Sequence, residues 1–142
     1  MTVPAEPLFL SREDVEEIHA YQTRVFGGSP GLRDSGLLES AVATPQSSFG
    51  GKFLYADVFE MAAAYMVSII GNHPFLDGNK RTGAMSAAVF LEVNGYDFRA
   101  DASEFTAVAF KAAQGKISVR ELGDFFRRAA KPRGNEESTE AE

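Results

Sequence analysis

The sequence predicts an all-α fold, a compact bundle of about six helices. Six separate stretches carry helix start signals or apolar residues at helical spacing, and short segments rich in glycine, proline and asparagine divide them. The 142 residues suffice for one domain with one core, and a hydrophobic fraction of 44% is ordinary for a globular protein. There is no cysteine, which excludes disulfides and thiolate metal sites.

The first two helices are separated by a loop rich in glycine and proline. Ser11, followed by acids in the next turn, is typical of a helix start, and Gly27-Gly28 is typical of its end. After the loop over 27–33, a short second helix is predicted from residue 34 or 35 to about residue 43. Residues 45–52 are then predicted to form a loop or a small hairpin.

The third helix is predicted to be the central one, because it opens at Asp57 and is apolar on nearly all sides. A loop over 71–78 leads to a fourth helix over 79–94. Two amphipathic helices are expected over 102–114 and 118–130. We therefore expect a single domain over residues 1–131, followed by an acidic disordered tail over residues 132–142.

Charge and hydropathy narrow the class of protein. The formal net charge is −6, but four of the acids stand in residues 134–142, so the rest of the chain is nearly neutral. No basic stripe is present, which argues against nucleic acid as the main partner. Residues 1–10 lack the pattern of a secretory signal, and the most apolar run, 61–70, is shorter than the ~20 residues of a membrane span. We expect a cytoplasmic protein.

The stretch 73–82, His-Pro-Phe-Leu-Asp-Gly-Asn-Lys-Arg-Thr, carries the most chemical information. It places an imidazole, a carboxylate, a glycine, an amide and two adjacent cations where a helix begins. A helix start offers free main-chain N–H groups and the positive end of the dipole, which bind phosphates. A base, a carboxylate able to hold a metal and a phosphate site together indicate phosphoryl or nucleotidyl transfer.

Two residues of this stretch are candidates for the chemistry itself. His73 is the candidate general base, because an imidazole accepts the proton of an attacking hydroxyl near neutral pH. Asp77 is the candidate magnesium ligand, and the alternative is a helix cap. Phe75 and Leu76 are expected to anchor the loop in the core. His19 has no such neighbours and is expected to be a partly exposed residue of the first helix.

The following four residues are candidates for nucleotide binding. Gly78 allows a phosphate to approach the main chain closely, and Asn79 either caps the fourth helix or bonds a phosphate. Lys80 and Arg81 would neutralise a polyphosphate, and the alternative is a solvated charge pair. Cations at a helix start oppose the dipole, and such an unfavourable placement is typical of a ligand site.

This stretch resembles the signature of the Fic/Doc proteins, His-x-Phe-x-Asp/Glu-Gly-Asn-Gly-Arg-x-x-Arg, and specifically its death-on-curing (Doc) branch. That branch carries lysine in place of the second glycine, where this chain has Lys80; Ala84 replaces the last arginine. Met85 stands where a Doc-like protein would present an amide. Segments 26–36, 90–96 and 115–118 fit the same branch, so the resemblance runs from about residue 9 to about residue 130 and implies the helical Fic/Doc fold.

The Doc resemblance implies a toxin of a toxin–antitoxin pair that transfers the γ-phosphate of ATP, with Mg²⁺, to a Ser or Thr hydroxyl of a protein. The implied target is elongation factor Tu, and the implied outcome is growth arrest. A Phd-like antitoxin, expected to bind an apolar groove, would be the partner. Two alternatives stay open: transfer of AMP to a protein hydroxyl, and a binding module without catalysis.

Residues 45–55 contain a second candidate element. The resemblance implies a flap that aligns the target segment by strand-like pairing, and its contacts would come from Ser48, Phe49, Lys52 and Phe53. The alternative is an ordinary surface loop.

Overall fold

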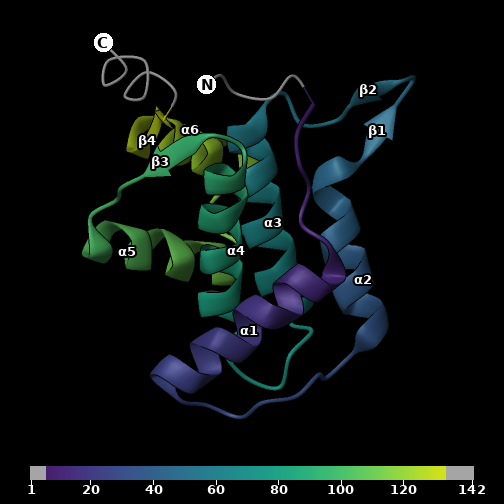
Figure 1. The fold of residues 1–142 in the computed structure, drawn as a ribbon, viewed down its shortest axis with the longest axis vertical. Coiled ribbons are helices and arrows are strands. Elements are labelled where there is room, and N and C mark those ends of the chain that lie inside the picture. The colour runs from purple at the N-terminus through teal and green to yellow at the C-terminus, as the bar shows by residue number, and fades with distance from the viewer. Residues whose placement is uncertain (1–5, 134–142) are drawn as a thin grey trace.

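Six α-helices and two small sheets make up the structure, a computed structural model that describes residues 6–133 (Figure 1). This confirms the predicted all-α class. The helices are α1 (Arg12–Phe26), α2 (Ser35–Ala43), α3 (Val58–Asn72), α4 (Asn79–Val93), α5 (Ala102–Ala113) and α6 (Val119–Ala129), with a 3-10 turn at Thr44–Gln46. The strands are β1 (Ser48–Phe49), β2 (Lys52–Phe53), β3 (Tyr96–Phe98) and β4 (Ala130–Pro132).

Helix α3 is the centre of the bundle, as its apolar sequence predicted. It packs against α2, α4, α5 and α6, and Figure 1 shows it running through the middle of the molecule beside α4. Two glycines bring neighbouring helices close: a Cβ on Gly83 of α4 would lie 3.1 Å from the Met66 carbonyl, and one on Gly123 of α6 would lie 3.3 Å from the Glu60 Cα. The buried side chains of α3 are Met61, Ala62, Ala63, Ala64, Tyr65, Met66, Ile69 and Ile70.

A buried hydroxyl ties the segment before α1 to the core. Tyr65 is 0% exposed, and its hydroxyl accepts a hydrogen bond from the Leu10 N–H at 2.8 Å and donates one to the Leu10 carbonyl at 3.3 Å. Burial raises the pKa of Tyr65 well above its ordinary value, because the phenolate would lose its hydration. The neutral phenol therefore satisfies two main-chain groups at once.

The two small sheets differ in how they meet the helices: Tyr96 and Phe98 of β3 pack against the hydrophobic core, whereas both strands of the β1–β2 hairpin are exposed. Of the loop and the hairpin expected for residues 45–52, the structure has the hairpin, whose register joins Ser48 to Phe53 and so ends one residue later. The antiparallel β3–β4 pair had no signal in the sequence, and its register joins Tyr96 to Pro132. The Arg133 N–H donates to the Gly95 carbonyl at 2.8 Å, so hydrogen-bonded structure passes the expected boundary at residue 131. The rest of the expected acidic tail, 134–142, lies outside the described residues.

Among residues 6–133, no helix is both long enough and apolar enough to cross a membrane.

Candidate functional site

The 73–78 loop joins the end of α3 to the start of α4, which lie side by side in the bundle (Figure 1). With the first turn of α4 and one face of α5, it encloses a cavity of about 900 Å³. All six predicted catalytic, metal and nucleotide residues line this cavity. The lining residues are Phe26, Ile70, His73, Leu76, Asp77, Gly78, Asn79, Lys80, Arg81, Ala84, Ala102, Phe105, Thr106, Ala109, Phe110 and Ala113.

His73 ends helix α3 in an unusual conformation. Its φ of 54° and ψ of 52° lie in the left-handed region, and it is the one non-glycine residue with positive φ in the described part of the chain. Its N–H donates to the Ile69 carbonyl at 3.1 Å, which closes the last turn of the helix. The exposed side chain lines the cavity, where an incoming hydroxyl could reach the imidazole.

The Asp77 carboxylate is oriented by two main-chain donors. One oxygen accepts a hydrogen bond from the Gly78 N–H at 2.9 Å, and the other accepts one from the Ser29 N–H at 3.2 Å. Each oxygen keeps a further lone pair, and the residue is exposed. Within residues 6–133 no three His, Asp or Glu side chains gather as metal ligands. A lone carboxylate that shares its metal with phosphate and water suits Mg²⁺.

Helix α4 begins without a side-chain cap. Its N-cap, Gly78, has φ 80° and ψ 20°, and no side chain bonds the N–H groups of the first turn. Within the described residues those groups at positions 79–81 have no partner, so they are available to an anion. The positive φ favours glycine at position 78. A second reason is steric, because a Cβ there would lie 2.1 Å from Nε2 of buried Gln22. The sequence alone carried no sign of this contact.

Asn79 holds the loop rather than the anion through its side chain. The amide oxygen accepts from the Phe75 N–H, and the amide nitrogen donates to the Phe75 carbonyl, both at 3.0 Å. The side chain is buried, with 4% exposed. Both polar ends of the amide are therefore occupied, and only the main-chain N–H of Asn79 remains to meet a phosphate.

Both predicted cations rest on aromatic rings at the mouth of the cavity. The Lys80 ammonium lies 5.5 Å from the centre of the Phe110 ring, and the Arg81 guanidinium lies 4.7 Å from that of Phe26. Neither cation forms a salt bridge within residues 6–133. The two rings are about half exposed, so the charges stay accessible to a ligand.

Helix α5 forms an apolar wall that the sequence analysis had not assigned to the site. It contributes Phe105, Ala109 and Phe110, among others. The residue that could have pointed to this wall is Phe110, an aromatic side chain that is 54% exposed on an amphipathic helix. An exposed aromatic residue is itself common, so only its position opposite the α4 start connects it to the cavity.

Two expectations for residues around the loop were wrong. Leu76 is 57% exposed, whereas Phe75 is buried as expected. His19 is not partly exposed: 5% of it is accessible, its ring stacks on Phe75 at 3.9 Å, and its Nε2 lies 2.8 Å from the Asp77 carbonyl. Helix α1 thus supports the loop through His19. The contact joins residues 58 positions apart, so helical spacing within α1 did not reveal it.

The expected flap lies far from this cavity. Ser48, Phe49, Lys52 and Phe53 are all exposed on the β1–β2 hairpin, and Phe53 packs edge-on against Phe9. The hairpin precedes α3 and the motif loop follows it, so the two sit at opposite ends of a 15-residue helix about 22 Å long (Figure 1). No hairpin residue lines the cavity, so the structure does not bring the four flap candidates together with the motif residues.

Comparison with known proteins identifies the family of this chain. The chain belongs to the Fic/DOC family, whose profile matches residues 9–91. Over 93 residues it is 42% identical to "Toxin Doc" of Mycolicibacterium smegmatis, a match that covers 66% of this chain and 69% of that protein. Over 119 residues it is 34% identical to "Protein kinase doc" of Escherichia phage P1, covering 84% and 93%. The resemblance stated from the sequence is confirmed.

Proposed function

We propose that this protein is a Doc-type toxin that transfers the γ-phosphate of ATP to a Ser or Thr hydroxyl of a cytoplasmic protein, with elongation factor Tu as the expected target. The observation that carries the proposal is the meeting of His73, Asp77 and the uncapped start of α4 around one cavity. The names of the two relatives, a toxin and a protein kinase, support the same class of activity.

The proposed step uses each group according to its chemistry. The target hydroxyl oxygen forms a bond to the γ-phosphorus, the bond from that phosphorus to the bridging oxygen breaks, and ADP leaves. His73 takes the hydroxyl proton. The free N–H groups of the α4 start, together with Lys80 and Arg81, bind the phosphates. Asp77 would hold Mg²⁺, which supplies charge neutralisation when bound.

Two features favour the γ-phosphate over AMP as the transferred group. The Lys80 side chain fills space at the helix start that a glycine would leave to a phosphate, so we propose that the terminal phosphate faces His73. Ala84, where the general signature carries arginine, lines the cavity without a charge. The apolar wall of α5 is suited to the nucleotide base, because aromatic rings stack on bases.

The test is transfer from ATP labelled separately at the α- and γ-positions, with Mg²⁺ and elongation factor Tu, read by autoradiography and intact mass. We expect γ-label on the target, a mass gain of one phosphate, and no transfer by His73→Ala. Label arriving only from the α-position, with a gain of one AMP, would establish the alternative of nucleotidyl transfer. If no label moves while the wild type still arrests growth, the protein is a binding module.

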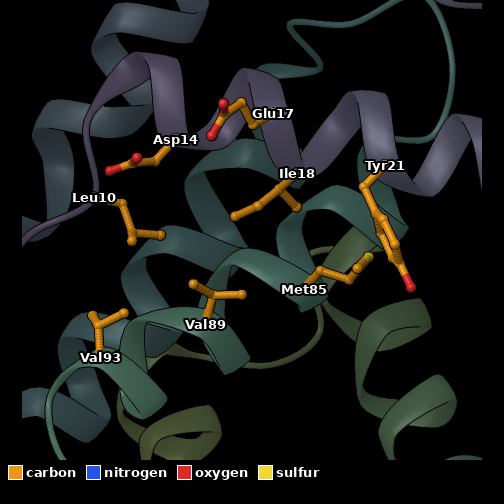
Figure 2. Close-up of a pocket in the computed structure, with 8 residues that line it drawn as sticks. All are labelled: Leu10, Asp14, Glu17, Ile18, Tyr21, Met85, Val89 and Val93. Atoms are coloured by element: carbon orange, nitrogen blue, oxygen red, sulfur yellow. The ribbon is translucent and has the colours of Figure 1, made fainter.

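A groove between α1 and α4 is the proposed antitoxin site. Figure 2 shows Ile18 and Tyr21 of α1 facing Met85, Val89 and Val93 of α4. The groove that these residues line has a volume of about 410 Å³. Leu10 closes one end, and the carboxylates of Asp14 and Glu17 stand on the α1 rim. An apolar floor with an acidic rim suits an amphipathic helix with basic flanks. We assign it to a Phd-like antitoxin.

Two matched substitutions test this assignment. Val93 is 43% exposed in the groove, and Val25 is 54% exposed on α1 outside it. Val93→Asp should weaken antitoxin binding about 10-fold or more, because it places a charge against an apolar helix face, and Val25→Asp should not. Calorimetry measures the affinity of each variant for the product of the neighbouring reading frame. Equal affinities for the two variants would overturn the assignment.

A further inference from the structure

The segment between α1 and α2 lies alongside the motif loop, and residues 28–34 of it are termed the clamp segment. We propose that the clamp segment sets the positions of His73 and Asp77 relative to each other, with Arg33 and Gly28 as positioning residues. This inference rests on the proposed function, because it assigns those two motif residues a joint role. Neither Arg33 nor Gly28 lines the cavity, so they would act through the motif residues that they contact.

The middle of the clamp segment pairs with the motif loop in antiparallel fashion. Leu32 and Phe75 form an isolated antiparallel β-bridge, and the Leu76 N–H donates to the Gly31 carbonyl at 3.1 Å. Phe75 is buried whereas Leu76 is exposed. Main-chain pairing, not burial of both side chains, therefore holds this part of the loop.

Arg33 binds the motif loop where it leaves α3. Its Nε donates to the His73 carbonyl at 2.6 Å and its Nη2 to the Asn72 carbonyl at 3.0 Å. Its main-chain N–H donates to the Pro74 carbonyl at 2.7 Å. The guanidinium thus satisfies two carbonyls at the C-terminal end of α3. The negative end of the helix dipole lies there and also stabilises its positive charge. These bonds fix the peptide that follows His73, which is the residue in the left-handed conformation.

The other end of the clamp segment holds Asp77. The Ser29 N–H donates to one carboxylate oxygen at 3.2 Å. Beside it, Gly28 has φ 114°, and a Cβ there would lie 2.8 Å from the same oxygen. The carboxylate therefore lies directly against the main chain, and a methyl group at position 28 would displace it. Groups that orient a metal ligand typically alter metal affinity or activity 10- to 100-fold when changed.

One short segment thus contacts the candidate base at one end and the candidate metal ligand at the other. Transfer requires these two groups to meet the same phosphate, and a misplacement of about 1 Å can cost ~100-fold in rate. A role limited to folding predicts something different: loss of Arg33 would lower stability, with activity following only the fraction of folded protein.

Arg12 provides a matched control for Arg33. It lies in α1 and bonds two residues of α2, Ser35 at 2.7 Å and Glu39 at 2.9 Å, and it has no hydrogen bond to the motif loop. We expect Arg33→Met to lower kcat at least ~10-fold with KM for ATP within about 2-fold, since binding groups remain while the base is misplaced. Arg33→Met and Arg12→Met should lower Tm by similar small amounts. Arg12→Met should leave kcat unchanged. Arg33→Lys, which keeps one donor, should recover part of the lost kcat.

Gly27 provides the control for Gly28. It has φ 87°, and a Cβ there would meet nothing within 4 Å, so alanine at either position adds backbone strain but only one displaces the carboxylate. Gly28→Ala should raise the Mg²⁺ concentration for half-maximal activity about 10-fold, in the range found for groups that orient a metal ligand. Gly27→Ala should leave that concentration near the wild-type value.

A readout independent of activity separates this inference from the proposed function. The Leu76 amide, which donates to Gly31, should exchange its hydrogen at least ~10-fold faster in Arg33→Met than in Arg12→Met. If the wild type transfers no phosphate, the proposed function fails while the exchange rates still test the clamp segment. If Arg33→Met matches Arg12→Met in both exchange and kcat, the clamp segment has no positioning role and the inference is overturned.

Discussion

The two ends of helix α3 carry loops that are held in different ways. At its C-terminal end, the motif loop is bonded to the clamp segment, stacked on His19 and closed by Asn79. At its N-terminal end, the β1–β2 hairpin has its own short ladder, a hydrogen bond from the Leu54 N–H to the Ser47 carbonyl, and an edge contact between Phe53 and Phe9. Phe49, at 86% exposure, shows how little of the hairpin is covered.

One glycine from each loop shows how differently the two loops are packed. Gly78 in the motif loop and Gly51 in the hairpin have nearly the same φ, 80° and 81°. A Cβ at Gly78 would collide with Gln22, whereas one at Gly51 would meet open space. A positive φ therefore marks a turn in both loops, but only the neighbours of Gly78 mark a constructed site. A glycine-rich loop is informative about function when other elements pack against it.

The largest expected effect is on catalysis at the motif end. His73→Ala should reduce phosphate transfer by about 10²–10⁴-fold, because it removes the general base. The side chain is exposed, so the melting temperature should stay close to that of the wild type. Initial rates with γ-labelled ATP measure the loss. A variant that retains more than a tenth of wild-type turnover would show that His73 is not the base.

The paired glycines give the next largest effect. Gly51→Ala should cost about 1 kcal/mol, the strain of a left-handed non-glycine residue. Gly78→Ala carries the same strain plus the contact with Gln22, and overpacking adds about 1–3 kcal/mol. Urea unfolding of both variants measures the difference. Equal losses would mean that the motif loop is no more constrained than the hairpin.

A substitution in the middle of α3 gives a reference value for the stability changes expected at its two ends. Tyr65→Phe should cost about 1–3 kcal/mol, because the Leu10 N–H and carbonyl lose their buried partner. Since burial raises the pKa of Tyr65 in the folded state, this stability is complete below the ordinary value of 10.0 and falls as the pH rises above it. Urea midpoints at pH 8 and pH 10.5 should therefore differ more in the wild type than in the variant.

The smallest effect is expected in the hairpin. Phe49→Ala should change the free energy of unfolding by no more than about 0.5 kcal/mol, since the ring is exposed and makes no aromatic contact within the described residues. Phosphorylation of the protein target should also be unchanged. A selective loss of target phosphorylation, with ATP binding intact, would instead support the flap assignment.

The helices and their starts were predictable because their determinants are local. Ser11 bonds the N–H of Asp14 and Asp14 bonds back, a contact that spans three residues and is legible in sequence. The apolar surface of α3 likewise identified it as the central helix. The motif His73–Arg81 placed the base, the carboxylate and the cations together, since all stand within nine residues of one another.

What the sequence by itself determined is therefore the helical class, the order of the helices and the family to which the motif belongs. Only the tertiary structure decided that His19 supports Asp77 across 58 residues and that Arg33 binds His73 across 40. It also decided that the hairpin stands at the opposite end of α3 (Figure 1). The physical reason is range: caps and periodicity act within a few residues, whereas these contacts depend on which elements the apolar core brings side by side.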